Sequence, residues 1–218
     1  MCKNFDAVIF DFDGTVADTG KGIFGSIRYA LNACSLPQLD EKSLRTFIGP
    51  PLHDSFKREC GADDEMCVKL VAKYRENYAV KGIFEFELYP GMEELLKKLK
   101  AEGIVTGIAS SKPEDFINVI LNNTRLNKYF DFTSGSDLRY VESDKTEIVK
   151  KCIRKMKLPE NSKILMVGDR FYDIVGAHNA GIECAAVLFG YGNPEEFKKY
   201  KAEYIVKDVN ELKNIIFG

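Results

Sequence analysis

Short apolar runs that alternate with amphipathic stretches constrain the fold of this chain more than any other feature of its sequence. Runs of three to six residues predict five buried strands, at 7–10, 104–109, 163–167, 184–188 and 204–206. Helical periodicity between or after these runs predicts helices at 93–102, 114–122, 147–156 and 209–216. Because parallel strands are joined by crossovers that are usually helical, the alternation predicts an α/β fold with a doubly wound parallel sheet.

The stretch from residue 21 to residue 86 interrupts this alternation. It holds no strand-like run, and its apolar residues follow helical spacing in two stripes: Ile23, Ile27, Ala30, Leu31 and Cys34, and then Met66, Leu70, Tyr74 and Tyr78. The α/β pattern restarts at Pro90 and Gly91. The sequence therefore predicts a small all-helical domain, residues 18–87, inserted after the first strand of a core domain that comprises residues 1–17 and 88–218.

Composition excludes several classes of protein. With 218 residues, of which 45% are hydrophobic and 29% charged, the chain can bury a substantial core. The 31 Lys and Arg residues against 33 Asp and Glu give a net charge of −2, without the basic excess that nucleic-acid-binding proteins usually show, so we expect no nucleic-acid partner. The first apolar run is too short for a signal peptide or a membrane span, so we expect a cytoplasmic protein without a membrane partner. The six Cys residues lack zinc-type spacing and are expected to be reduced thiols, most of them buried.

Polar side chains follow three of the predicted strands at their carboxyl ends, and a lysine opens a predicted helix nearby. In chain order they are Asp11, Asp13, Ser110, Ser111, Lys145, Asp169 and Asp173. The carboxyl ends of parallel strands meet at one edge of a sheet, where ligands bind. We therefore expect these side chains to lie close together.

Several aspartates at one edge repel one another, and such a cluster normally needs a cation. Carboxylate oxygens without His or Cys favour Mg²⁺ over zinc. The hydroxyl of Ser110 and the ammonium of Lys145 suit the remaining oxygens of a phosphate. The residues therefore predict a magnesium site next to a phosphate site.

Four motifs occur in a fixed order along the chain: Asp11-Phe12-Asp13-Gly14-Thr15, Ser110 after an apolar strand, Lys145, and Gly168-Asp169-Arg170-Phe171-Tyr172-Asp173. With a helical insertion after the first motif, they resemble the haloacid-dehalogenase-like phosphatase superfamily, specifically its phosphoglycolate-phosphatase-like branch. The resemblance covers essentially the whole chain. It implies a Mg²⁺-dependent phosphomonoester hydrolase that acts on a small phosphorylated metabolite, with the inserted helices as a cap domain.

The resemblance also implies a role for each aspartate. Asp11 would attack phosphorus and form an aspartyl-phosphate, and Asp13 would act as general acid and then as general base. Mg²⁺ would be held by the Asp11 carboxylate, the Asp13 backbone carbonyl and Asp169, with Asp173 in the outer shell.

The phosphoryl group would be bound, by the same resemblance, by Ser110, Ser111 and Lys145. Lys112 lies two residues past Ser110 and competes with Lys145 for this role, but its position beside a proline favours an exposed lysine.

The turn Gly49-Pro50-Pro51-Leu52 in the inserted stretch leaves two interpretations open. It can simply break the chain between two helices. Alternatively it faces the active site and selects the leaving group, as the corresponding cap loop does in relatives.

The reaction and the substrate also leave alternatives. Phosphoglycolate leads by resemblance, followed by a nucleotide 5′-monophosphate or a sugar phosphate. The other classes are a β-phosphoglucomutase-like isomerase and a binding protein that has kept the fold. Ser111 and Thr146 stand where the family frequently has asparagine and proline, which weakens any assignment to one substrate. A monomer and a homodimer are both compatible with the sequence.

Overall fold

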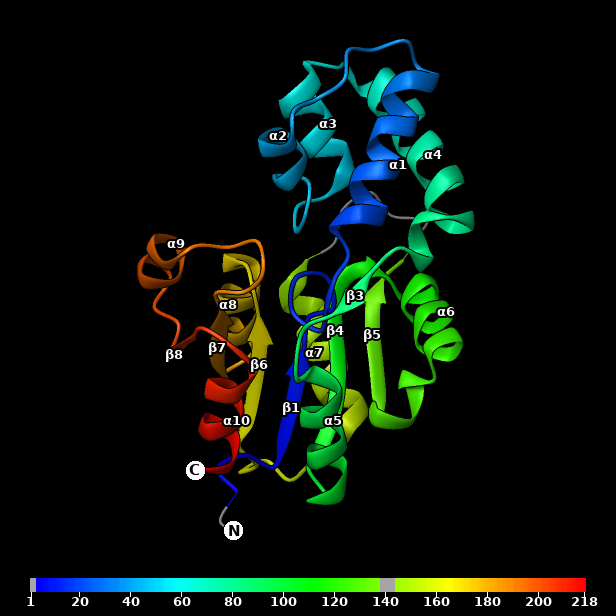
Figure 1. The fold of residues 1–218 in the computed structure, drawn as a ribbon. Helices are drawn as coiled ribbons and strands as arrows, with labels where there is room; N and C mark the ends of the chain where they lie inside the picture. The colour runs from blue at the N-terminus through cyan, green and yellow to red at the C-terminus, as the bar shows by residue number, and fades with distance from the viewer. Residues whose placement is uncertain (1–2, 138–143) are drawn as a thin grey trace. The chain divides into compact units, whose positions relative to one another are not determined.

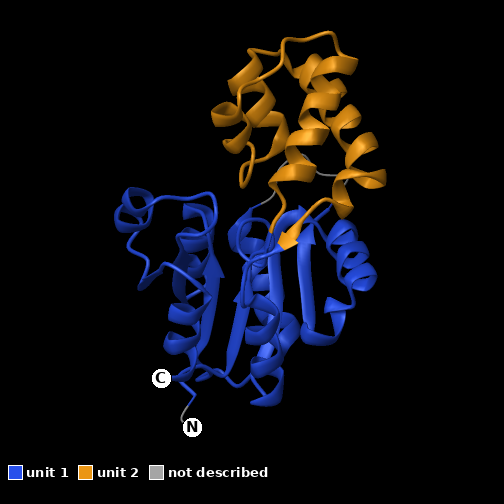
Figure 2. Ribbon diagram, in the orientation of Figure 1, with its two compact units in different colours: residues 1–17, 88–218 blue, residues 18–87 orange. Residues whose placement is uncertain are grey.

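The structure is a computed structural model that describes residues 3–137 and 144–218. The chain divides into two compact units, residues 1–17 with 88–218 (unit 1) and residues 18–87 (unit 2), as Figure 2 shows. The strands β2 (Ala17–Asp18) and β3 (Glu87–Leu88) pair where the chain passes from one unit to the other.

Unit 1 is built around a six-stranded sheet with the order β5-β4-β1-β6-β7-β8, in which all neighbours are parallel. The strands are β1 (Ala7–Phe10), β4 (Val105–Pro113), β5 (Phe132–Ser136), β6 (Ile164–Gly168), β7 (Glu183–Val187) and β8 (Tyr204–Val206). In β1, Ala7 lies opposite Val105 of β4 on one side and Ile164 of β6 on the other. The strand order reverses at β1, so the carboxyl edge next to β1 is where a ligand site is expected. The predicted fold class is confirmed.

Two features of the sheet differ from the sequence prediction. The prediction lacks β5, because residues 132–136 are mostly polar and form no apolar run. The strand lies at an edge of the sheet, where polar residues are tolerated. In addition, β4 continues past residue 109 to Pro113, so Ser110 and Lys112 belong to the end of a strand.

Helices cover both faces of the sheet, with α5 and α10 in front and α7 and α8 behind in Figure 1. The helices of unit 1 are α5 (Met92–Ala101), α6 (Glu114–Thr124), α7 (Lys145–Met156), α8 (Phe171–Asn179), α9 (Pro194–Lys199) and α10 (Val209–Phe217), with the 3₁₀ turn η2 (Leu126–Tyr129). Ala7 and Ile9 of β1 pack in one cluster with Val149 of α7 and Ile174 of α8. Because both faces are covered, consecutive residues of the central strands are buried, which explains their uninterrupted apolar runs.

Unit 2 consists of α1 (Gly20–Ala33), α2 (Glu41–Arg45), α3 (Leu52–Cys60), α4 (Asp64–Val80) and the 3₁₀ turn η1 (Gly82–Phe84). Its core forms where α1 packs against α4, with Ile27 and Leu70 fully buried. Gly22 lets α1 approach η1, since a Cβ there would lie 2.0 Å from the carbonyl oxygen of Gly82. None of the helices in the described ranges has the length and hydropathy needed to cross a bilayer.

Candidate active site

The central strand β1 leads directly into the first two candidate residues, Asp11 and Asp13. The backbone N–H of Asp11 donates to the carbonyl of Val167 at 2.8 Å, which continues the ladder between β1 and β6 and fixes the direction of Asp11. The chain then turns at Gly14, whose φ is +81°. A Cβ on this residue would lie 2.1 Å from Oδ2 of Asp169, so a glycine is required both by the backbone and by the close approach of the carboxylate.

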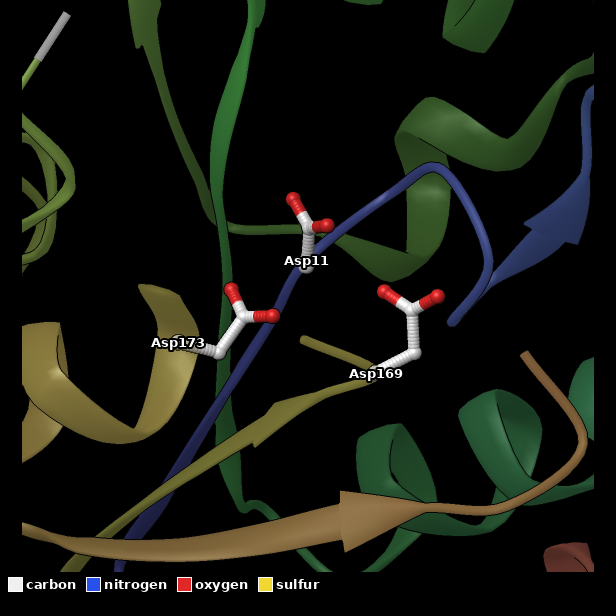
Figure 3. A group of neighbouring side chains, drawn as sticks. All are labelled: Asp11, Asp169 and Asp173. Atoms are coloured by element: carbon white, nitrogen blue, oxygen red, sulfur yellow. The ribbon is translucent and has the colours of Figure 1, made fainter. Parts of the chain in front are cut away.

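Three buried carboxylates, from Asp11, Asp169 and Asp173, converge at the carboxyl edge of the sheet (Figure 3). One oxygen atom of each lies within 4.8 Å of the other two. Asp11 follows β1, Asp169 follows β6, and Asp173 lies in the first turn of α8. The parallel strands β1 and β6 are neighbours, which is why residues far apart in the sequence meet here.

A loop that the sequence analysis missed holds the carboxylate of Asp169. The backbone N–H of Tyr191 donates to Asp169 Oδ2 at 2.7 Å. A Cβ on Gly190 would lie 2.4 Å from the Cβ of Asp169, so this loop also needs a glycine at its closest approach. The available signal was the pair of glycines, Gly190 and Gly192, directly after a predicted strand that ends at the same edge of the sheet.

Lys145 connects two of the three aspartates. It is the first residue of α7, and its buried ammonium lies 2.8 Å from Asp11 Oδ1 and 2.7 Å from Asp173 Oδ1. The other oxygen of Asp173 accepts a hydrogen bond from the backbone N–H of Arg170 at 3.0 Å. Asp173 is therefore held between the start of its own helix and Lys145.

Burial and mutual repulsion dominate the electrostatics of this cluster. Burial raises the pKa of the Asp169 carboxyl well above its usual range, and the charges of Asp173 and Asp11 raise it further. Burial also raises the pKa of Asp173 to about 6, against the opposing effect of Lys145. For Lys145, burial by itself would lower the pKa, but attraction to Asp11 and Asp173 outweighs it and the pKa lies above its usual range. When all three carboxyls are ionised, their negative charge exceeds the single positive charge of Lys145.

These residues fit a hard divalent cation. The buried Oδ1 of Asp169 has no hydrogen-bond partner within the described ranges, and it belongs to the cluster of three carboxylates. A buried carboxylate oxygen without a partner destabilises the folded protein unless a ligand binds to it. The oxygen-only set suits Mg²⁺ better than a softer metal.

Ser110, Lys112 and Asp13 form a second part of the site. Ser110 is buried at the carboxyl end of β4, and its hydroxyl accepts a hydrogen bond from the backbone N–H of Lys112 at 3.3 Å. Lys112 is also buried, and its ammonium lies 2.9 Å from Asp13 Oδ1. The expectation of an exposed lysine is wrong, because β4 extends through this position and carries the side chain into the site.

The remaining sequence candidates are Ser111 of unit 1 and the turn 49–52 of unit 2. Ser111 is half-buried, and its carbonyl accepts a hydrogen bond from the hydroxyl of Ser136 in β5 at 2.8 Å. In unit 2, Gly49 has a φ of +107°, Pro51 caps α3, and Leu52 begins that helix. The involvement of the turn 49–52 in selecting a leaving group stays a prediction.

Comparison with known proteins identifies the class to which this fold and site belong. The profile of the family described as haloacid dehalogenase-like hydrolase matches residues 8–187. A 5′-nucleotidase of Pseudomonas aeruginosa is 31% identical over 209 residues, which cover 96% of this chain and 94% of the relative. Pyrophosphatase PpaX of Bacillus velezensis is 28% identical, with 98% of this chain and 97% of the relative covered.

A solved structure of a candidate phosphatase from Clostridium difficile superposes with a TM-score of 0.89 at 40% identity, covering 99% of this chain and 100% of that one. The chain belongs to the haloacid dehalogenase-like hydrolase family. Within that family it is an enzyme of the phosphatase type, in agreement with its similarity to named phosphatases. The predicted superfamily is confirmed.

Proposed function

We propose that unit 1 catalyses Mg²⁺-dependent hydrolysis of a phosphomonoester through a phosphorylated Asp11. The observation that carries this proposal is the buried arrangement of Asp11 between Lys145 and the two further carboxylates of Asp169 and Asp173. A phosphate monoester is close to a dianion at neutral pH, so its approach to an aspartate requires positive charge on that edge of the sheet.

The reaction would proceed in two displacements at phosphorus. A carboxylate oxygen of Asp11 attacks phosphorus, the bond from phosphorus to the ester oxygen breaks, and Asp13 gives its proton to the departing alcohol. Asp13 then takes a proton from water, whose oxygen attacks the phosphorus of the aspartyl-phosphate. The bond from phosphorus to Asp11 breaks, inorganic phosphate leaves, and both aspartates return to their starting states.

The residues that would hold Mg²⁺ are Asp11, Asp169 and the backbone carbonyl of Asp13. The unpartnered oxygen of Asp169 supports this assignment. Asp173 already forms an ion pair with Lys145 and accepts a hydrogen bond from the N–H of Arg170, which suits a place further from the ion. Bound Mg²⁺ would supply positive charge that offsets the repulsion between the phosphoryl oxygens and the carboxylates.

The phosphoryl group itself would be bound by Lys145, Ser110 and Ser111. The burial of Lys145 and its contact with the nucleophile, Asp11, support this role. Ser110 is buried at the same edge of the sheet, at the end of the strand next to β1. Ser111 is the weakest member of the set, since it is half-buried and its carbonyl is bonded toward β5.

Two substrates are favoured by different observations. The motifs resemble those of phosphoglycolate phosphatases, which favours 2-phosphoglycolate. The 5′-nucleotidase of Pseudomonas aeruginosa, aligned over nearly all of both chains, favours a nucleoside 5′-monophosphate.

Phosphate release from a panel of esters tests the proposal. The panel contains 2-phosphoglycolate, nucleoside 5′-monophosphates, pyrophosphate and sugar phosphates, each measured with Mg²⁺ and with chelator. We expect release only with Mg²⁺, one ester far ahead of the rest, and a loss of about 10⁴-fold or more for Asp11→Asn, because the attacking carboxylate is gone. The exposed Asp115→Asn is the matched control and should retain full activity.

Three outcomes would contradict the proposal. Full activity of Asp11→Asn would exclude the covalent route, and full activity with chelator would exclude a requirement for the metal. Conversion of a sugar 1-phosphate to the 6-phosphate without release of phosphate would instead indicate the mutase.

A further inference from the structure

We propose that Lys112 is a positioning residue that holds the carboxylate of Asp13 in the orientation needed for proton transfer. This inference rests on the proposed function, in which Asp13 gives a proton to the leaving group. It assigns to Lys112 a task separate from the binding of phosphate.

The contact between the two side chains is short and largely shielded from solvent. The ammonium of Lys112 lies 2.9 Å from Asp13 Oδ1, and the exposed fractions of the two side chains are 4% and 15%. A lysine that is desolvated to this extent needs an anionic partner close by. Rotation of Asp13 away from Lys112 would weaken this contact, so the pair restrains the rotamer of the aspartate.

The backbone around Lys112 is anchored in a way that directs its side chain. The N–H of Lys112 donates to the hydroxyl of Ser110, and the carbonyl of Ser111 accepts from Ser136. A Cβ on Gly135 would lie 2.6 Å from the carbonyl oxygen of Lys112, which shows how closely β5 packs on this segment. The register of β4 against β5 shifts between Ala109 and Pro113, and Lys112 lies within that irregularity.

The two buried lysines of the site contact different aspartates. Lys145 forms ion pairs with Asp11 and Asp173, in the part of the site that would hold the metal and the phosphoryl group. Lys112 forms an ion pair with Asp13, the residue assigned to the leaving group. Loss of Lys112 should therefore affect the departure of the alcohol more than the binding of phosphate.

A series of esters with one phosphoryl group and different leaving groups tests this division. p-Nitrophenolate departs without receiving a proton. Phenolate depends more on protonation, and an alkoxide such as that from β-glycerophosphate depends on it most. For Lys112→Met, we expect kcat/KM to fall about 100-fold on β-glycerophosphate and less than about 5-fold on p-nitrophenyl phosphate. The plot of log kcat/KM against leaving-group pKa should become steeper, with the half-saturating Mg²⁺ concentration unchanged.

Two further variants complete the experiment. Lys112→Arg keeps the charge and should recover part of the loss on β-glycerophosphate. Lys155→Met removes a partly buried lysine that pairs with Glu114 elsewhere in unit 1, and should leave the slope of the plot unchanged. If Lys112→Met does not fold, Lys112→Arg is measured on the same series and should steepen the plot to a smaller extent.

Parallel lines, with an equal loss on every ester, would overturn the proposal, as would a raised KM with an unchanged kcat. Either result would assign Lys112 to the phosphoryl group. A wild-type protein that hydrolyses no ester with Mg²⁺ is a different result, and it would refute the proposed function itself.

Discussion

Among the single residues, Asp169 has a carboxylate that the fold holds by one oxygen while the other oxygen has no hydrogen-bond partner in the described residues. Its Oδ2 is bonded to the N–H of Tyr191, and Gly14 and Gly190 allow the backbone to approach it from two sides. Its Oδ1 is buried without a hydrogen-bond partner in the part of the chain that the structure describes. Such a group destabilises the protein by itself and is stabilised when a cation binds.

Asp169→Asn is therefore expected to abolish stabilisation of the protein by Mg²⁺. In the wild type, Mg²⁺ at about 100 times its dissociation constant adds about 2.7 kcal/mol to the free energy of unfolding. For a chain of this size that corresponds to a rise in Tm of about 5–10 °C over the value in chelator. The measurement is thermal unfolding of Asp169→Asn with and without Mg²⁺, with Asp115→Asn as the control that keeps the rise. A full rise in the Asp169 variant would show that the ion binds elsewhere.

At the scale of elements, Glu114 joins three parts of unit 1. It opens α6, its carboxylate pairs with Lys151 and Lys155 of α7, and it accepts a hydrogen bond from the N–H of Gly135 in β5. Partial burial raises the pKa of Glu114, but its hydrogen bonds to the two lysines and to Gly135 outweigh this effect and the pKa is lowered. The ionised form is therefore favoured in the folded state.

Glu114→Gln should reduce stability in a pH-dependent way. A carboxyl whose pKa is lowered by folding stabilises the protein above its unfolded pKa, and this contribution is lost as the pH falls through the folded pKa. We expect the variant to lose about 1–2 kcal/mol of unfolding free energy at pH 7, and the difference from wild type to shrink as the pH falls below the usual pKa range of a glutamate and through the lowered pKa of Glu114. Urea denaturation at a series of pH values measures the loss at pH 7 and its change with pH, with the exposed Glu160→Gln as control. A difference that is constant with pH would show that packing, and not charge, is responsible.

At the scale of the whole molecule, each of the two units has its own core. In unit 1 the core lies between the sheet and its helices, while in unit 2 it lies between α1 and α4. Two glycines of α1 offer a matched way to test this independence. A Cβ on Gly22 would collide with the carbonyl of Gly82, whereas a Cβ on Gly25 would lie 3.8 Å from the carboxylate of Glu85 and meet nothing closer.

Gly22→Ala is expected to destabilise unit 2 by about 1–3 kcal/mol through overpacking. Gly25→Ala should be neutral or stabilise it by up to about 1 kcal/mol, because alanine is favoured over glycine inside a helix. Hydrogen exchange measures the effect element by element: amides of α1 and α4 should lose protection in Gly22→Ala, while amides of β1 and β6 keep theirs. Equal loss in β1 and β6 would mean that the two units unfold as one.

The sequence determined much of the fold because burial on both faces of a parallel sheet leaves a local signal. Apolar runs located β1, β4, β6, β7 and β8, and helical periodicity located α5, α6, α7 and α10. β5 gave no such signal, since residues 132–136 are polar and the strand is specified by its pairing with β4. Pairing between distant segments has no counterpart in local composition.

The same contrast holds for the site. Asp11, Asp13, Ser110, Asp169 and Asp173 stand at or just after the ends of predicted strands, so the sequence by itself placed them at one edge and determined the class of chemistry. Only the tertiary structure decided that Lys112 is buried against Asp13 and that the N–H of Tyr191 holds Asp169. The reason is physical: the partner of a buried charge is chosen by distances of about 3 Å between segments far apart in the chain, and residue order contains no such distance.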